Sequence, residues 1–164
     1  MLVVYDDVMK VLAVDPGYDR LGVAVLERSG GVDVLLYSGC IEPPKSAAFI
    51  DRLLFLGEAF VALLKKHTPD ALAVETLFFN RNQKTAIGVA QARGVILFLG
   101  KQHSCAVREF GPQEVKVAVT GYGKSDKAAV ISMVHKLLPN APDTAHDDEY
   151  DAIAVGITCL AHFR

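Results

Sequence analysis

Apolar runs of two lengths alternate with polar, glycine- and proline-containing breaks along the chain, and they predict a mixed α/β protein. The first run, residues 10–15, is short and β-branched and stops at a Pro-Gly turn, which is typical of a buried strand. Residues 21–28 and 32–41 read as two further strands joined by the hairpin-type turn 29–31. We therefore expect three successive antiparallel strands.

Helical and strand patterns alternate in the rest of the chain. A helix is predicted over residues 46–67 with Ser46 as its N-cap, and a second, rich in small residues and without a clean polar face, over 85–103. A helix of that kind is either fully buried or packs against a partner. The other predicted elements are strands 71–75 and 105–110 and helices 112–120, 126–138 (capped by Ser125) and about 147 to the C-terminus. This order predicts a five-stranded mixed sheet with helices covering its faces.

Composition bounds the protein class. With 164 residues, 51% of them hydrophobic, the chain can bury a core without disulfides, and we expect an extension over residues 1–9 and one domain over 10–164. Cys40, Cys105 and Cys159 lack metal-ligand spacing and suit a reducing, cytoplasmic location. No apolar run is long enough to span a membrane, and the N-terminus is not a signal peptide, so we expect no membrane partner.

The net charge of the chain and the distribution of charge along it lead to different expectations about nucleic acid as a partner. A formal net charge of −2 argues mildly against nucleic acid. Residues 79–142, however, carry 9 basic and 3 acidic groups, and both flanking segments are acidic. A basic middle segment can neutralise DNA phosphates, although a merely solvated basic face has equal weight on charge alone.

Acidic residues lie where predicted elements begin or end. Asp15 and Glu75 each end an apolar strand, whereas Asp148 and Asp151 share one face at the start of the last helix. Desolvated carboxylates repel one another unless a cation binds them, and oxygen ligands suit Mg²⁺ or Mn²⁺. Individually, Asp15 could be a turn acid, Glu75 could pair with a lysine, and the helix-start acids could be solvated and matched to the helix dipole.

Two loops carry further candidate chemistry. Phe78 and Phe79 follow the fourth strand in a polar segment, where an aromatic ring can stack on or wedge between bases. Alternatively, one ring lies in the core and the other in a dimer contact. The glycine-rich segment 121–125 lacks the spacing of a nucleotide-binding loop, and we expect it to bring backbone N–H groups and Lys124 near DNA phosphates.

Together these segments resemble the RuvC family of Holliday-junction resolvases. The resemblance covers nearly the whole chain from Lys10 onward, and its blocks come in family order at residues 11–25, 71–82, 88–95, 111–130 and 148–158. It implies the ribonuclease-H-like α/β fold, a five-stranded mixed sheet in which three antiparallel strands are followed by parallel ones.

The resemblance also implies a set of catalytic residues. The metal-binding acids fall on Asp15, Glu75, Asp148 and Asp151, which would hold two Mg²⁺ ions per subunit, with Mn²⁺ able to substitute. Asp147 is an alternative to Asp148, and His146 is either a loop residue or a group behind the ligands. Lys127, and with it Lys116, is expected near the scissile phosphate. The expected DNA contacts are Phe78, Arg81, Lys84, Lys116, Lys124 and Lys127.

The implied activity is metal-dependent resolution of four-way DNA junctions by symmetric paired nicking that leaves 5′-phosphate and 3′-hydroxyl ends, in recombination and repair. A homodimer matches the two-fold symmetry of the junction, with helix 85–103 as the expected interface and Phe55 as a weaker candidate. The resemblance also implies RuvA–RuvB as partners. The alternatives are a catalytically silent junction-binding protein and an actin-like kinase half-domain, for which 164 residues leave no second domain.

Overall fold

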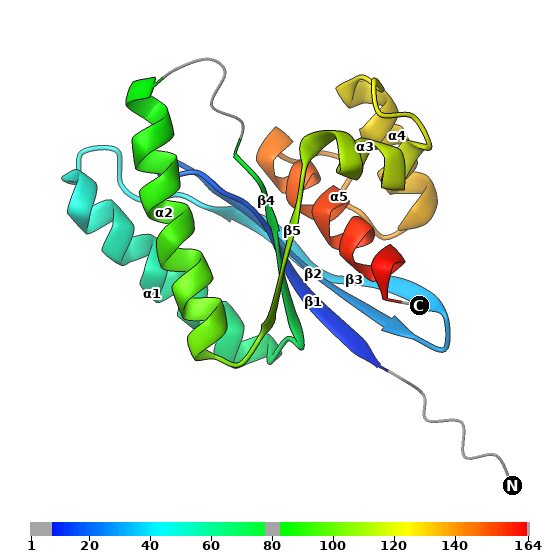
Figure 1. Ribbon diagram of the computed structural model, residues 1–164, viewed down its shortest axis with the longest axis horizontal. Helices are drawn as coiled ribbons and strands as arrows, with labels where there is room; N and C mark the ends of the chain where they lie inside the picture. Colours follow the sequence, from blue (N-terminus) through cyan, green and yellow to red (C-terminus); the bar gives the residue numbers. More distant parts are fainter. Residues whose placement is uncertain (1–7, 78–82, 164) are drawn as a thin grey trace, which may run out of the picture.

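The computed structural model describes residues 8–77 and 83–163, which contain one five-stranded sheet in the order β3-β2-β1-β4-β5 (Figure 1). Its strands are β1 (Met9–Asp15), β2 (Leu21–Ser29), β3 (Val32–Ile41), β4 (Ala71–Glu75) and β5 (Ala106–Phe110). The first three strands pair antiparallel, whereas β4 and β5 run parallel to β1. The predicted mixed sheet is confirmed.

Helices cover both faces of this sheet. Figure 1 shows α1 (Phe49–His67) and α2 (Gln83–Gln102) on one face, and α3 (Pro112–Thr120), α4 (Lys127–Leu137) and α5 (Asp147–His162) on the other. α5 lies across β1 and β2, and α3 and α4 pack beside it. The predicted element order is confirmed. Among the described residues, no helix is both long enough and apolar enough to cross a membrane.

Strand β1 is central because both of its faces are covered. Alternate residues of a strand point to opposite faces, so Val11 and Ala13 belong to the core beneath α5, whereas Leu12 and Val14 belong to the core beneath α1 and α2. All four side chains are fully buried. A continuous apolar run is what a strand buried on both faces requires.

Glycine allows α5 to approach the sheet closely. A Cβ added at Gly156 would lie 2.3 Å from Leu26 Cδ1, and one added at Gly22 would lie 1.9 Å from the carbonyl oxygen of Asp148. Helix backbone and strand backbone are therefore in contact at the start of α5. This approach fixes the depth at which the first turn of α5 meets the sheet.

The predicted N-cap of the first helix is wrong. The cap of α1 is Ala48, which makes no side-chain capping hydrogen bond, and the helix begins at Phe49. Residues 45–47 form a turn instead, in which Ala47 N donates to Pro44 O over 3.0 Å. Arg52 reaches back to the carbonyl oxygens of Lys45 and Ala47 and stabilises this turn.

The cap predicted at Ser125 is also wrong by one residue. The carboxylate of Asp126 accepts a hydrogen bond from Ala129 N at 2.8 Å and caps α4. The Ser125 hydroxyl donates to Tyr122 O and lies 2.7 Å from Thr120 Oγ1. Ser125 therefore stabilises the loop before the helix.

Candidate active site

Two strands end in carboxylates at the same edge of the sheet. β1 and β4 are parallel neighbours that pair up to Val14 and Val74, and each has an acid as its next and last residue. These acids are Asp15 and Glu75, and a hydrogen bond joins their side chains. The topology of the sheet therefore brings together two residues that are 60 positions apart in the sequence.

Helix α5 adds two more carboxylates from the opposite end of the chain. Asp148 and Asp151 lie three residues apart in its first turns and so share one face. Carboxylate oxygens of Asp15, Asp148 and Asp151 all lie within 4.8 Å of one another. An all-carboxylate donor set of this kind fits a hard divalent cation such as Mg²⁺ or Mn²⁺.

The electrostatics of this cluster call for a positive charge. Burial, followed by the charges of Glu75, Asp151 and Asp148, raises the pKa of Asp15 from 3.8 to about 8. Burial and then Asp151 raise the pKa of Glu75, while hydrogen bonding from Asp15 opposes that rise. Without a cation, the raised pKa values of Asp15 and Glu75 favour a proton held within this hydrogen-bonded pair. A divalent ion would replace that proton and offset the repulsion.

Two cationic side chains flank the cluster. Lys127, the first residue of α4, places Nζ 2.8 Å from Asp151 Oδ2 and 3.3 Å from Asp147 Oδ2. On the other side, Arg20 places Nη1 3.4 Å from Asp148 Oδ2. Both contacts are partly exposed, so each contributes modestly to stability and leaves its cation near the edge of the site.

The structure distinguishes the adjacent acids of α5. Asp148 lies in the carboxylate group, whereas Asp147 pairs with Lys127 and is not part of that group. The backbone of His146 precedes the helix as its N-cap, and its Nε2 lies 3.6 Å from Glu42 Oε1. The geometry therefore favours the Asp148–Asp151 pair as the contribution of α5.

The expected DNA contacts are placed unevenly. Lys116 on α3 is half-buried, and its charge lowers the pKa of Glu75, as that of Lys127 does; α3 and α4, which carry the two lysines, cover the same face of the sheet (Figure 1). Lys124 is exposed in the loop before α4. Phe78 and Arg81 lie outside the described residues. Lys84 lies in α2, but its side chain is outside the description.

Other basic residues of the middle segment are held within the fold. Arg93 pairs with Glu109 and directs its Nε toward the carbonyl oxygen of Glu75 at 3.5 Å. Arg108 lies over the ring of Phe163, 5.5 Å from its centroid. The charge count of the segment therefore overstates the cations that are available to a ligand.

Arg20 and Glu42 are the site residues that sequence reasoning missed. Arg20 Nε donates to Glu42 Oε1 at 2.9 Å while its Nη1 faces Asp148, so the guanidinium links the β3–α1 segment to a candidate metal ligand. The one signal in the sequence is that Arg20 follows Asp15 by five residues, on the turn into β2. The contact to Asp148 spans 128 residues and is visible only in the folded chain.

Comparisons with known proteins agree with this geometry. The family model "Crossover junction endodeoxyribonuclease RuvC" matches residues 11–159. The chain is 46% identical to the crossover junction endodeoxyribonuclease RuvC of Thermosipho melanesiensis over 93% of this chain and 97% of the relative. It is 42% identical to that of Halothermothrix orenii over 91% of this chain and 90% of the relative.

A solved structure gives the same result for the fold. The chain superposes on T. thermophilus RuvC in complex with a Holliday junction substrate with a TM-score of 0.89 and 28% identity, over 95% of each chain. The ribonuclease-H-like α/β fold expected from the sequence is thereby confirmed.

Proposed function

Because the chain belongs to the RuvC family of crossover junction endodeoxyribonucleases, we propose that it resolves four-way DNA junctions by symmetric paired nicking. The chain is a metal-dependent endonuclease, and its nicks leave 5′-phosphate and 3′-hydroxyl ends suited to ligation. The observation that carries the proposal is the group formed by Asp15, Asp148 and Asp151, with Glu75 bonded to Asp15. A catalytically silent junction-binding protein would not need this costly cluster of desolvated acids.

The residues divide the chemistry between them. Asp15, Asp148 and Asp151, together with Glu75, would hold two Mg²⁺ ions, which Mn²⁺ can replace. A divalent metal held by these residues would supply activation of a water for in-line attack and stabilisation of the leaving 3′ oxygen. Asp15 is hydrogen-bonded to Glu75 and has a carboxylate oxygen within 4.8 Å of those of Asp148 and Asp151, which supports its proposed role as a metal ligand.

Lysines at the edge of the site would stabilise charge on the phosphate. Lys127 Nζ lies within hydrogen-bond distance of Asp151, a candidate ligand, so it is positioned beside the reacting group. Lys116 acts from α3 on the same side. A fixed ammonium next to developing negative charge lowers the energy of the transition state. Phe78, Arg81, Lys84 and Lys124 remain our proposed contacts to the rest of the junction.

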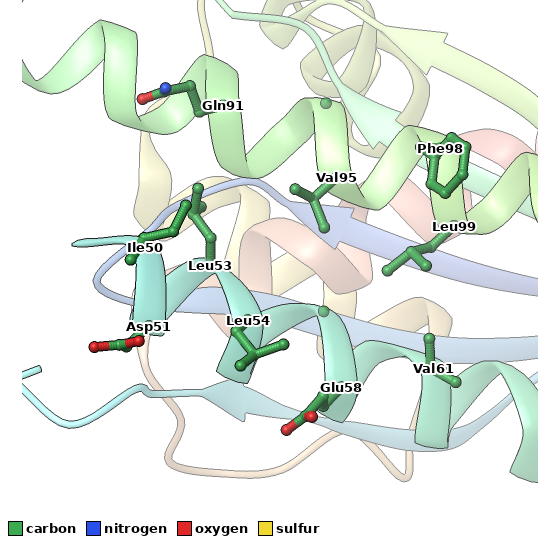
Figure 2. Close-up of a pocket in the computed structure, with 12 residues that line it drawn as sticks. Ile50, Asp51, Leu53, Leu54, Glu58, Val61, Gln91, Val95, Phe98 and Leu99 are labelled. Atoms are coloured by element: carbon green, nitrogen blue, oxygen red, sulfur yellow. The ribbon is translucent and has the colours of Figure 1, made fainter. Parts of the chain in front are cut away.

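A second copy of the chain is the proposed protein partner. α1 and α2 form an apolar groove of about 1070 Å³, lined by Ile50 and Leu54 of α1 and by Val95, Phe98 and Leu99 of α2 (Figure 2). Ile50, Leu54 and Phe98 are each at least 60% exposed. A monomer rarely leaves such a patch uncovered. Two copies joined here would present two sites to the two strands of a symmetric junction.

The proposed interface differs from the expected one in its details. α2 contributes to it as predicted from the sequence, but α1 contributes Ile50 and Leu54, whereas Phe55 is 41% exposed and does not line the groove. We further propose that residues 10–164 act as one nuclease domain in the cytoplasm, and that a RuvA–RuvB complex delivers the junction.

Cleavage of a synthetic four-way junction tests the proposal. With Mg²⁺ the protein should nick opposite strands symmetrically, and with EDTA or plain duplex it should not. Asp15→Asn should reduce cleavage at least ~1000-fold while junction binding persists, because one carboxylate ligand is lost. Asp143→Asn, which removes an exposed acid outside the cluster, is the matched control. Equal cutting of duplex and junction, or full activity of Asp15→Asn, would contradict the proposal.

A further inference from the structure

A second concave surface lies next to the carboxylate group and shares Asp148 with it. This hollow of about 680 Å³, here called the Arg20 hollow, is lined by residues 17–20, Glu42, Lys45, Arg52, Thr85, Val89 and Asp148. Its walls are the β1–β2 turn, the β3–α1 segment and the first turns of α2. Three of its side chains are cationic, and none of them belongs to the proposed catalytic set.

The walls of the Arg20 hollow are built rather than incidental. Arg52 pairs with Asp19 on one wall and donates to the carbonyl oxygens of Lys45 and Ala47 on another. Tyr18 packs against α2, where a Cβ added at Gly88 would lie 2.8 Å from its ring. Arg52 therefore links the β1–β2 turn to the β3–α1 segment, and Tyr18 of that turn packs against α2, which forms the third wall.

Arg20 is held so that part of its guanidinium stays available. Nε donates to Glu42 at 2.9 Å and Nη1 faces Asp148 at 3.4 Å, which fixes the plane of the group. Among the described residues, Nη2 of Arg20 has no hydrogen-bond partner and Lys45 has no ion-pair partner. A planar guanidinium held in this way is suited to two parallel hydrogen bonds to a phosphate.

The charge of the Arg20 hollow depends on the neighbouring site. Its cations Arg20, Lys45 and Arg52 are balanced by Asp19, Glu42 and Asp148. Once Asp148 is engaged by a divalent cation, the balance becomes positive and the hollow favours an anion. In a nucleic-acid strand, charges recur about every 3.4 Å along the helix axis, so a strand at the carboxylate group carries further phosphates nearby.

We propose that the Arg20 hollow binds the backbone phosphate adjacent to the scissile one, with Arg20 and Lys45 as its contacts and Arg52 as a positioning residue. The inference rests on the proposed nuclease function. In this proposal the β1–β2 turn and the β3–α1 segment fix the position of the cleaved DNA strand along the site. They do so on the side opposite Lys127. Contacts to the two flanks of the scissile phosphate would then hold it in line for attack.

Neutralising one phosphate at a time tests this assignment. Junctions carrying a methylphosphonate at the position on either side of the cleaved bond are compared with the native junction, using the wild type, Arg20→Gln and Lys45→Gln. For the wild type, one neutral phosphate should raise KM about tenfold, as expected for losing a hydrogen-bonded charge. Arg20→Gln should show the same rise on native DNA and no further rise on the modified junction.

The lack of additivity separates phosphate binding from a structural role. If Arg20 only oriented Asp148, the neutral phosphate would impair Arg20→Gln as much as the wild type, and the proposal would be overturned. Lys65→Gln, which removes an exposed lysine of α1 outside the hollow, is the matched control and should behave as the wild type.

Binding provides a readout that does not depend on cleavage. The slope of log affinity against log salt for junction DNA should decrease by about one for Arg20→Gln, and again for Lys45→Gln. A wild-type protein that binds the junction but does not cut it would contradict the proposed function. The salt slopes would still show whether the Arg20 hollow binds a phosphate. Unchanged slopes in both variants would overturn it.

Discussion

Helices α5 and α2 lie on opposite faces of the sheet. Each is rich in small and apolar residues, but the two differ in how exposed their side chains are. On one face, ten of the 16 residues of α5 are buried. On the other, α2 leaves Ile87 and Phe98 65% exposed, which excludes the fully buried position that its sequence also allowed. Small residues bring α5 against the strands and position its carboxylates, whereas in α2 one small residue, Gly94, borders an open groove.

Among changes that test this difference between the two faces, the largest effect should come from separating α5 from the sheet. Gly22→Ala places a Cβ 1.9 Å from the carbonyl oxygen of Asp148, so the first turn of α5 must move. Because a misplacement of about 1 Å can cost roughly 100-fold in rate, junction cleavage per folded molecule should fall by about that factor. Single-turnover cleavage, with folding followed by circular dichroism, measures it.

Gly94→Ala is the corresponding change on the other face. A Cβ there meets nothing within 4 Å, so the variant should fold as the wild type or be more stable by up to about 1 kcal/mol. If Gly22→Ala cleaved at the wild-type rate, close contact between α5 and β2 would not set the geometry of the site.

A smaller effect should follow from placing charge in the open groove. Phe98→Glu should raise the dissociation constant of the dimer about 30-fold, because it replaces a large exposed aromatic of the proposed interface with a charge. Sedimentation equilibrium measures the constant. The free energy of unfolding of the dilute monomer should change by less than about 0.5 kcal/mol, since the ring is exposed.

Phe55→Glu is the control for that experiment. Phe55 is also exposed on α1 but does not line the groove, so this variant should remain dimeric. Dissociation of Phe55→Glu together with an intact Phe98→Glu dimer would place the interface elsewhere on α1.

The smallest effect concerns the pH dependence of stability without metal. The folded-state pKa of Asp15 is raised to about 8, so its stabilising protonated form is fully present below the unfolded value near 3.8 and is lost as pH rises through about 8. Without metal, Tm should therefore fall between pH 5 and pH 9, by about 3 °C per kcal/mol lost. Differential scanning calorimetry with EDTA measures this.

Replacing the titrating group should flatten this dependence. Asp15→Asn removes the ionisation, so its Tm at pH 8 should exceed that of the metal-free wild type, and Asp143→Asn should leave the profile unchanged. A wild-type Tm that rises over the same range would show that Asp15 is ionised in the folded protein without metal.

The strands, the helices and the candidate acids can be predicted from the sequence because they follow from local patterns. Strand ends marked by Asp15 and Glu75 follow from local apolar runs, and the spacing of Asp148 and Asp151 follows from the helical repeat. Neither pattern depends on distant contacts. The elements and the candidate acids could therefore be predicted before the fold was known.

The remaining features depend on packing between distant segments. The pairing of Arg20 with Glu42 and Asp148, and the groove that α1 forms with α2, arise from tertiary contacts that leave no period in the sequence. The errors at Ser46 and Ser125 have a similar origin, because carbonyl and hydroxyl partners from the preceding turns decide where each helix begins.

The site takes its acids from both ends of the described chain, and this has a consequence during synthesis. Asp15 and Glu75 emerge from the ribosome long before Asp148 and Asp151, so a nascent chain holds an incomplete set of ligands until residue 151 has been added and α5 has docked. Cleavage competence is thus one of the last properties the folding chain acquires. A metal titration during refolding would report the docking of α5 rather than formation of the sheet.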